Sequence, residues 1–230
     1  MIKTFLILIN FVNLLYSSQQ IIFVVSDDMN SSKAKLECYD GNKKVHDTMS
    51  VNIGKNGLGW GLGEVEFSQK TNKLLKYEGD KKAPIGIFKL THIFGYKKDN
   101  NFKMPYLFAS EKLICVDDSE SKHYNQIIQN NGDEKSFEYM RRDDHQYELG
   151  VVVEHNKNAQ KDRGSCIFIH VEKSQDSPTV GCTAMSLGEI KKISSWLDAQ
   201  KNPILIQIPK SSANEVLKIY PQLRDSKLLD

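Results

Sequence analysis

Short runs of apolar and β-branched residues, each bounded by turn-forming clusters, recur along most of this chain. Each run has the length of a single strand and is too short for a typical helix. The runs cover residues 20–25, 35–39, 48–53, 85–90, 149–153, 166–171 and 203–209. Strand-like residues also occupy 76–80, and Ala83-Pro84 predicts a turn ahead of 85–90. This alternation of short apolar runs and turn-forming clusters predicts a mostly β fold whose first three strands form an antiparallel meander.

Two segments in the last quarter of the chain have helical patterns. Ser186 and Glu189 have the spacing of a capping box, and apolar residues follow at helical spacing over 190–197. A second segment, 213–223, is predicted to be helical until Pro221 interrupts it. Helices are therefore expected to be few and peripheral to the strands.

Residues 97–136 are polar and have no clear periodicity. A stretch of this length inside a compact domain is typical of a functional lid or of the wall of a binding site. A disordered insertion has the same appearance in sequence. The sequence leaves both interpretations open.

The chain has 230 residues and a formal net charge of +2. This length favours one domain, which we place at residues 19–230. Lysine and arginine are interleaved with aspartate and glutamate, so no basic face is predicted that would neutralise phosphates, and nucleic acid is not expected as a partner. The spacing of cysteine and histidine matches no zinc motif, so we expect neither a metal nor a cofactor.

The first eighteen residues have the pattern of a secretory signal peptide. Lys3 supplies a positive charge, residues 5–16 are a short apolar run, and Ser17 and Ser18 are small residues at its end. A buried first strand or helix is the alternative. We expect residues 1–18 to be removed and the protein to be exported to the periplasm or cell envelope. Because no cysteine lies near the cleavage point, the mature protein is expected to be soluble or peripherally associated with the envelope.

The chain has four cysteines: Cys38, Cys115, Cys166 and Cys182. In an oxidising compartment four cysteines would suggest two disulfides. If Cys182 must remain a thiol for catalysis, however, the other three form one bridge at most. The sequence does not say which two would pair.

His170 and Cys182 are the candidate catalytic residues. A thiol needs a base to become a strong nucleophile, and both a nearby imidazole and the helix predicted after Cys182 would lower its pKa. Gly181 can adopt the sharp turn that presents a nucleophile. Backbone amides around Cys182 and Thr183 could bind an oxyanion. The alternative is a small buried cysteine and a satisfied core histidine.

The residues around this pair resemble a known active-site block. Residues 167–171 read Ile-Phe-Ile-His-Val, and residues 177–185 read Ser-Pro-Thr-Val-Gly-Cys-Thr-Ala-Met. Together they resemble the block of the L,D-transpeptidase (YkuD) family, and in particular its ErfK/YbiS/YcfS/YnhG branch, which reads Pro-Thr-Ala-Gly-Cys-Thr-Ala-Met. The likeness spans nearly the whole mature chain. It includes residues 54–58, 78–88, 94–96, 141–145, 196–198 and 202–203.

The resemblance implies a YkuD-like β-sandwich with a few peripheral helices, one of them directly after the catalytic cysteine. It also implies that Cys182 attacks the bond between the third residue of a peptidoglycan stem peptide and its terminal D-alanine. His170 would be the base, oriented by a backbone carbonyl, and the acyl group would pass to an amine of a second stem. Substrate binding is assigned to Arg141, Arg142, His145 and Thr179.

Two departures from the commoner family pattern leave the substrate contacts open. Val180 stands where that pattern has a second histidine, and Ala184 stands where it has arginine or asparagine. Two other functions remain as alternatives. An L,D-carboxypeptidase would use water as the acceptor, and a non-catalytic cell-wall-binding module would keep the fold without the chemistry.

Overall fold

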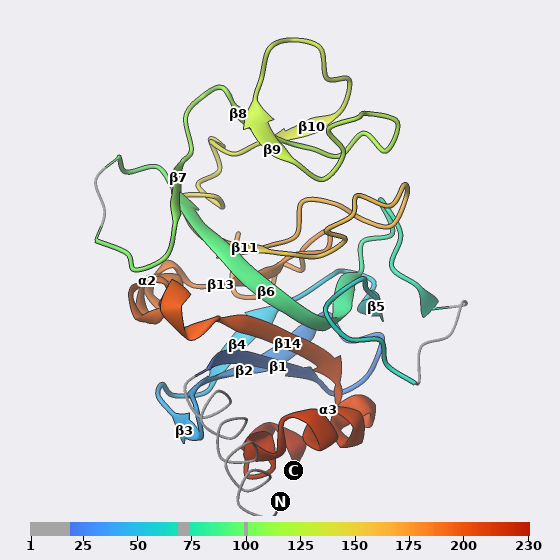
Figure 1. Ribbon diagram of the computed structural model, residues 1–230, viewed down its shortest axis with the longest axis vertical. Coiled ribbons are helices and arrows are strands. Elements are labelled where there is room, and N and C mark those ends of the chain that lie inside the picture. Colours follow the sequence, from blue (N-terminus) through green and yellow to red (C-terminus); the bar gives the residue numbers. More distant parts are fainter. Residues whose placement is uncertain (1–18, 69–73, 99–100) are drawn as a thin grey trace, which may run out of the picture.

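The computed structural model describes residues 19–68, 74–98 and 101–230 (Figure 1). The predicted signal peptide, residues 1–18, lies outside the described residues. Within the described part of the chain, no helix has the length and apolar character needed to cross a membrane.

A curved sheet forms the body of the molecule, and its first strand also pairs with the last but one, near the opposite end. Along the sheet the strands are β1 (Gln20–Ser26), β14 (Ile204–Pro209), β6 (Ala83–Gly95), β11 (Leu149–Val153), β12 (Phe168–Val171), β13 (Thr183–Met185), β4 (Met49–Asn52), β2 (Lys33–Asp40) and β3 (Lys43–Lys44). Strands β5 (Leu58–Trp60) and β7 (Tyr106–Phe108) also pair with β6. Because β1 pairs antiparallel with β2, the layers of the expected sandwich join into a closed ring. The prediction of a mostly β fold is confirmed, and the closure leaves few unpaired strand edges.

The first predicted strand is buried along its whole length, for a reason that the topology gives. Strand β1 lies between β2 and β14 within the sheet. Its outer face is covered by the C-terminal helix α3 (Ala213–Ile219), whose Val216 belongs to the same apolar core (Figure 1). A strand covered on both faces is apolar throughout instead of alternating. The core thus sits inside the ring and continues beneath α3.

The remaining helices follow the predicted pattern. The N-cap of α2 (Leu187–Trp196) is Ser186, and both hydrogen bonds of its capping box with Glu189 are present. Ile190 and Ile193 of this helix are buried in the core. Short 3-10 turns complete the C-terminal part, namely η2 (Ala199–Lys201), η3 (Lys210–Ser212), η4 (Pro221–Leu223) and η5 (Lys227–Leu229).

Two local predictions are wrong. Residues 76–80 form a turn instead of a strand, because the Asp80 carboxylate accepts hydrogen bonds from the backbone amides of Tyr77 and Lys82 and from the Lys76 ammonium group. Such local side-chain bonds compete with strand pairing. The turn expected at Ala83-Pro84 is instead the start of β6.

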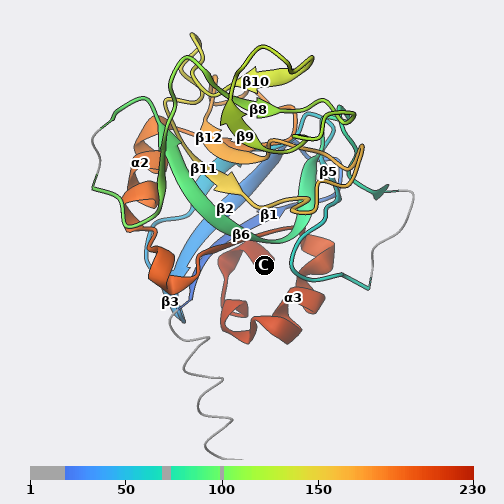
Figure 2. The same cartoon turned by 45° about the horizontal axis from the view of Figure 1, so that its top comes forward.

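The irregular segment after residue 97 folds into a small second sheet. Strands β8 (Leu113–Val116), β9 (Ile127–Gln129) and β10 (Phe137–Tyr139) pair antiparallel in the order β10-β8-β9. We call these strands and their connections, residues 113–139, the cover sheet. Figure 1 places it beyond one end of the main sheet, and Figure 2 shows it in front of β12. The interpretation as a wall of a site is therefore favoured over a disordered insertion.

Candidate active site

Strand pairing brings the segments that carry the two predicted catalytic residues side by side. Strands β12 and β13 run parallel, with His170 opposite Ala184. Cys182 lies in the turn directly before β13, and Tyr147 lies near both residues, because its ring packs on His170 and it belongs to the same apolar cluster as Cys182. Gly181 has φ +152°, and a side chain there would meet the Lys82 carbonyl oxygen. The turn that presents Cys182 therefore needs glycine.

Cys182 is deeply buried, with 4% of its surface exposed. Its Sγ accepts a hydrogen bond from the Phe168 amide at 3.3 Å, and its thiol donates to the Cys166 carbonyl at 3.5 Å. Burial, with a smaller contribution from the charge of Glu138, raises the pKa of Cys182 to about 12. The thiol is therefore protonated in this state.

This raised pKa contradicts the expectation of a thiol activated in advance. Strand β13 separates Cys182 from helix α2, which begins only at Leu187. The helix is present as predicted, but it does not follow the cysteine directly. Because the field of a helix terminus falls off within about one turn, it does not offset the burial of the thiol.

His170 is buried and held in one orientation. Its Nδ1 lies 2.8 Å from the Val171 carbonyl oxygen, so Nδ1 carries the proton and donates to this oxygen. Burial lowers the pKa of His170 to about 4. The imidazole is thus neutral near pH 7, and its Nε2 has a free lone pair that can accept a proton. The Val171 carbonyl thus orients the His170 ring, as expected of a backbone carbonyl.

Tyr147 and Glu138 complete the surroundings of His170, and neither was predicted from the sequence. The Tyr147 ring packs edge-on against the His170 ring, with 5.2 Å between centroids. Its hydroxyl donates a hydrogen bond of 2.5 Å to the Glu138 carboxylate, which comes from β10 of the cover sheet. Burial raises the pKa of both groups. Their positions depend on contacts between distant segments, which no local pattern in the sequence indicates.

The turn before Cys182 is fixed by the side chain of Thr179. Its Oγ1 donates to the Cys182 carbonyl at 2.6 Å and accepts from the Gly181 amide at 3.1 Å. The Thr183 hydroxyl donates to Gln207 in the interior. The Thr179 hydroxyl and the Gly181 amide therefore stabilise the turn, and the Thr183 hydroxyl anchors the residue after Cys182 to the interior. The contacts of Thr179 therefore indicate a role in holding the turn instead of a role in substrate binding.

The structure separates the three predicted substrate residues of the 141–145 run. The Arg141 guanidinium donates to two backbone carbonyls and stacks on the Tyr96 ring at 4.5 Å, so it holds its own loop in place. Arg142 lies over the Tyr147 ring at 5.1 Å and therefore borders the site. His145 is exposed, with 73% of its side-chain surface accessible. Of the three, Arg142 is the residue that the fold brings to Tyr147, beside the candidate base His170.

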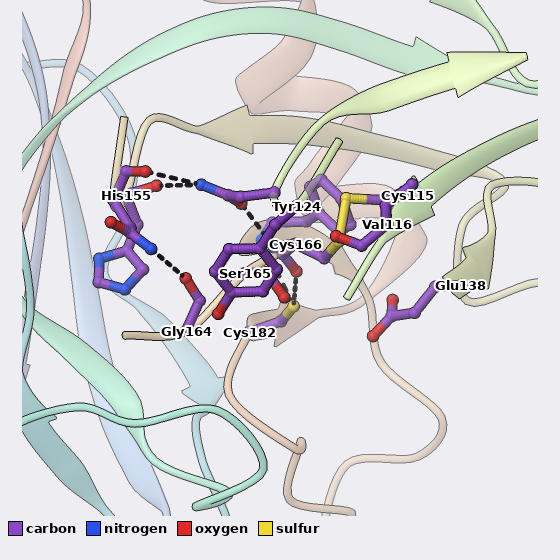
Figure 3. Close-up of a disulfide and its surroundings, with 12 residues drawn as sticks. Cys115, Val116, Tyr124, Glu138, His155, Gly164, Ser165, Cys166 and Cys182 are labelled. Atoms are coloured by element: carbon purple, nitrogen blue, oxygen red, sulfur yellow. Dashed lines mark hydrogen bonds between the residues drawn. A yellow bond between two sulfur atoms is a disulfide. The ribbon is translucent and has the colours of Figure 1, made fainter. Parts of the chain in front are cut away.

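One disulfide joins Cys115 to Cys166, whereas Cys38 and Cys182 are free and buried. The expectation that at most one bridge forms and that Cys182 stays a thiol is confirmed. Figure 3 shows the bridge between the cover sheet and the segment that leads into β12, with Cys182 close to Cys166.

Comparison with known proteins identifies the family. The model of the YkuD family, described as the L,D-transpeptidase catalytic domain, matches residues 20–206, which include both His170 and Cys182. No curated protein and no solved structure matches the chain significantly. The family predicted from the sequence is confirmed, whereas the narrower ErfK/YbiS/YcfS/YnhG branch stays a prediction. The chain belongs to the YkuD family of L,D-transpeptidase catalytic domains, whose chemistry depends on a cysteine nucleophile.

Proposed function

We propose that this protein is a peptidoglycan L,D-transpeptidase that works through an acyl-enzyme on Cys182. The observation that carries the proposal is the geometry of the pair. His170 lies on β12, Cys182 lies directly before the adjacent strand β13, and the Val171 carbonyl fixes the histidine tautomer that leaves Nε2 as a base. This placement supports nucleophilic catalysis by the Cys182 thiol with His170 as its base.

In the first half-reaction, Sγ of Cys182 attacks the carbonyl between stem residue three and D-alanine. His170 takes the thiol proton at Nε2 as the sulfur–carbon bond forms. The imidazolium returns that proton to the leaving amine, the carbon–nitrogen bond breaks, and D-alanine departs. A thioester remains on Cys182.

In the second half-reaction, an amine of another stem attacks the thioester. His170 accepts a proton from this amine, and the sulfur leaves as a thiol after receiving it back. The product is a cross-link between two stems. Because both catalytic groups are neutral at rest, the thiol proton is transferred during attack and is not lost beforehand.

The apolar surroundings of Cys182 support transfer to an amine over transfer to water. Cys182 belongs to an apolar cluster that includes Phe168 of β12. Leu113 of the cover sheet and Met140, the residue directly after the cover sheet, belong to the same cluster. Apolar contacts on this side limit the access of water to a thioester. Hydrolysis, which would make the protein an L,D-carboxypeptidase, is therefore the less favoured outcome.

The reaction can be tested with purified mature protein and disaccharide tetrapeptide. We expect release of D-alanine and dimers linked between third residues, both identified by mass spectrometry. Cys182→Ala and His170→Ala should abolish both products, whereas Cys38→Ala, which removes a buried thiol of the main core, should keep them. D-Alanine release by Cys182→Ala would refute the mechanism. If monomeric disaccharide tripeptide were the sole product, the reaction would be assigned as hydrolysis instead of transpeptidation.

We further propose that the protein acts in the cell envelope. Its N-terminal residues have the pattern of a signal peptide, and its Cys115–Cys166 disulfide is of a kind that persists in oxidising compartments. Fractionation of cells that express the full chain and a variant without residues 2–18 tests this. Export of the truncated variant, or retention of the full chain in the cytoplasm, would contradict the proposal.

A further inference from the structure

The Cys115–Cys166 disulfide reaches the nucleophile through the backbone of Cys166. Cys115 lies on β8 of the cover sheet, and Cys166 lies just before β12, which carries His170. The carbonyl oxygen of Cys166 is 3.5 Å from Sγ of Cys182 (Figure 3). A change in the position of Cys166 would therefore move a direct hydrogen-bond partner of the thiol.

Asn125 of the cover sheet holds the other side of Cys166. Its side-chain oxygen accepts a hydrogen bond from the Cys166 amide at 2.9 Å. Its side-chain nitrogen donates to the carbonyls of His155 and Asn156 at 2.8 and 2.9 Å. Cys166 has φ +54°, a conformation that residues other than glycine rarely adopt. The bridge and Asn125 together keep Cys166 in this conformation.

A shared carboxylate reinforces the same connection. Glu78 accepts hydrogen bonds from the Tyr124 hydroxyl at 2.6 Å and from the Ser165 hydroxyl at 2.7 Å. Tyr124 precedes Asn125, and Ser165 precedes Cys166. The cover sheet and the segment before β12 are thus joined by three connections: the disulfide, the bond from the Cys166 amide to Asn125, and the Glu78 carboxylate shared by Tyr124 and Ser165.

The cover sheet also reaches the catalytic base. Across β8 and β10, Cys115 lies opposite Glu138. Glu138 accepts the hydrogen bond of Tyr147, whose ring packs on His170. The bridge is therefore connected to the nucleophile through Cys166 and to the base through Glu138 and Tyr147.

We infer that Cys115 and Cys166 are positioning residues of the active site, joined so that the cover sheet keeps Cys182 and His170 in a closed, water-poor arrangement. Without the bridge, the cover sheet detaches from the segment before β12, the Cys166 carbonyl leaves the thiol, and water reaches Cys182. The thiol then reacts more readily with small electrophiles but transfers acyl groups more slowly. The part of this inference that concerns acyl transfer rests on the proposed function.

Alkylation with iodoacetamide tests the inference without a substrate. The variant Cys115→Ser/Cys166→Ser is compared with the native chain over pH 6–10, and labelling of each cysteine is followed by mass spectrometry of its peptide. Burial is the largest cause of the raised pKa of Cys182, so its loss should lower the apparent pKa of alkylation. A drop of one unit makes labelling near neutral pH about tenfold faster.

Cys38 is the internal control, because it is fully buried in the main core. Local detachment should expose Cys182 to the reagent while Cys38 stays protected. Cys38→Ala in the native background should leave the labelling of Cys182 unchanged. With tetrapeptide as substrate, kcat for D-alanine release should fall about tenfold in the double serine variant, with a smaller change in KM.

Two results would overturn the inference. One is an unchanged alkylation profile of Cys182 in the double serine variant. The other is equal exposure of Cys38 and Cys182, which would assign the bridge to global stability instead. If the variant does not fold, a phosphine that reduces the bridge to two thiols in the folded native protein gives the same comparison. If labelling of Cys182 is faster in the double serine variant but the native chain itself releases no D-alanine, the proposed function is refuted and the positioning role stands.

Discussion

The hydroxyl of Tyr147 donates a hydrogen bond of 2.5 Å to the carboxylate of Glu138, while the ring of the same tyrosine packs edge-on against His170. A residue from the cover sheet thus fixes the aromatic wall that holds the proposed base. This relationship connects the orientation of His170 to the position of a segment far away in the sequence.

Tyr147→Phe should keep the ring and remove the hydrogen bond. Glu138 would then lose a partner in a buried setting, which we expect to cost about 1–2 kcal/mol of stability and to slow D-alanine release. Chemical denaturation and the product assay measure the two effects. Tyr139→Phe is the matched control on β10, because half of the surface of Tyr139 is exposed. Equal behaviour of the two variants would argue against a role for the bond.

Lys76→Met should destabilise the protein strongly. The Lys76 ammonium group is buried and lies 2.6 Å from Asp80, so its loss leaves a largely buried carboxylate without its counter-ion. Breaking such a pair costs roughly 3 kcal/mol. The apparent pKa of Cys182 should also rise, because the charge of Lys76 lowers it.

Lys33→Met is the control for this prediction. Lys33 pairs with Asp176 at 3.0 Å, but both side chains are exposed. Screening by solvent limits such a pair to below about 1 kcal/mol. Urea unfolding of the two variants should therefore separate them clearly, and similar losses would contradict the importance of burial.

Stability should fall as the solution is acidified below pH 6.5. Burial lowers the pKa of His170 to about 4 and that of His155 to about 3, from an ordinary value of 6.5. Between these values the unfolded chain binds more protons than the folded chain, so stability present above pH 6.5 is lost as pH falls. The slope is roughly 1.4 kcal/mol per pH unit for each histidine.

Denaturation curves at successive pH values measure this slope. His155→Gln should reduce the slope of stability against pH, because it removes one of the two buried histidines with a lowered pKa. An identical slope in His155→Gln and the native protein would show that other groups control acid stability.

Gly181→Ala should impair activity more than it impairs folding. A side chain at this position would adopt a strained φ and approach the Lys82 carbonyl oxygen to 3.1 Å, which would displace Cys182. The strain is worth about 1–3 kcal/mol. Gly188→Ala, in helix α2 with open space around it, should be neutral or stabilise by up to about 1 kcal/mol. Full D-alanine release by Gly181→Ala would contradict the need for this turn.

Much of the fold could be predicted because its signals are local. The apolar runs at 20–25 and 149–153 correspond to β1 and β11, and the Ser186–Glu189 spacing correctly predicts the start of α2. The strand expected at 76–80 failed because Asp80 makes local bonds that strand propensity does not describe. Closure of the ring depends on the pairing of β1 with both β2 and β14, which lie far apart in the chain.

The sequence by itself determined the family and the candidate catalytic residues Cys182 and His170, because these depend on residue types in a fixed order. Only the tertiary structure decided that Cys115 pairs with Cys166, that Tyr147, held by Glu138, packs on His170, and that the thiol of Cys182 is protonated at rest. The physical reason is the same for all three. Burial and long-range contact arise when distant segments pack together, and the charge state of a buried group follows from the surroundings that this packing creates.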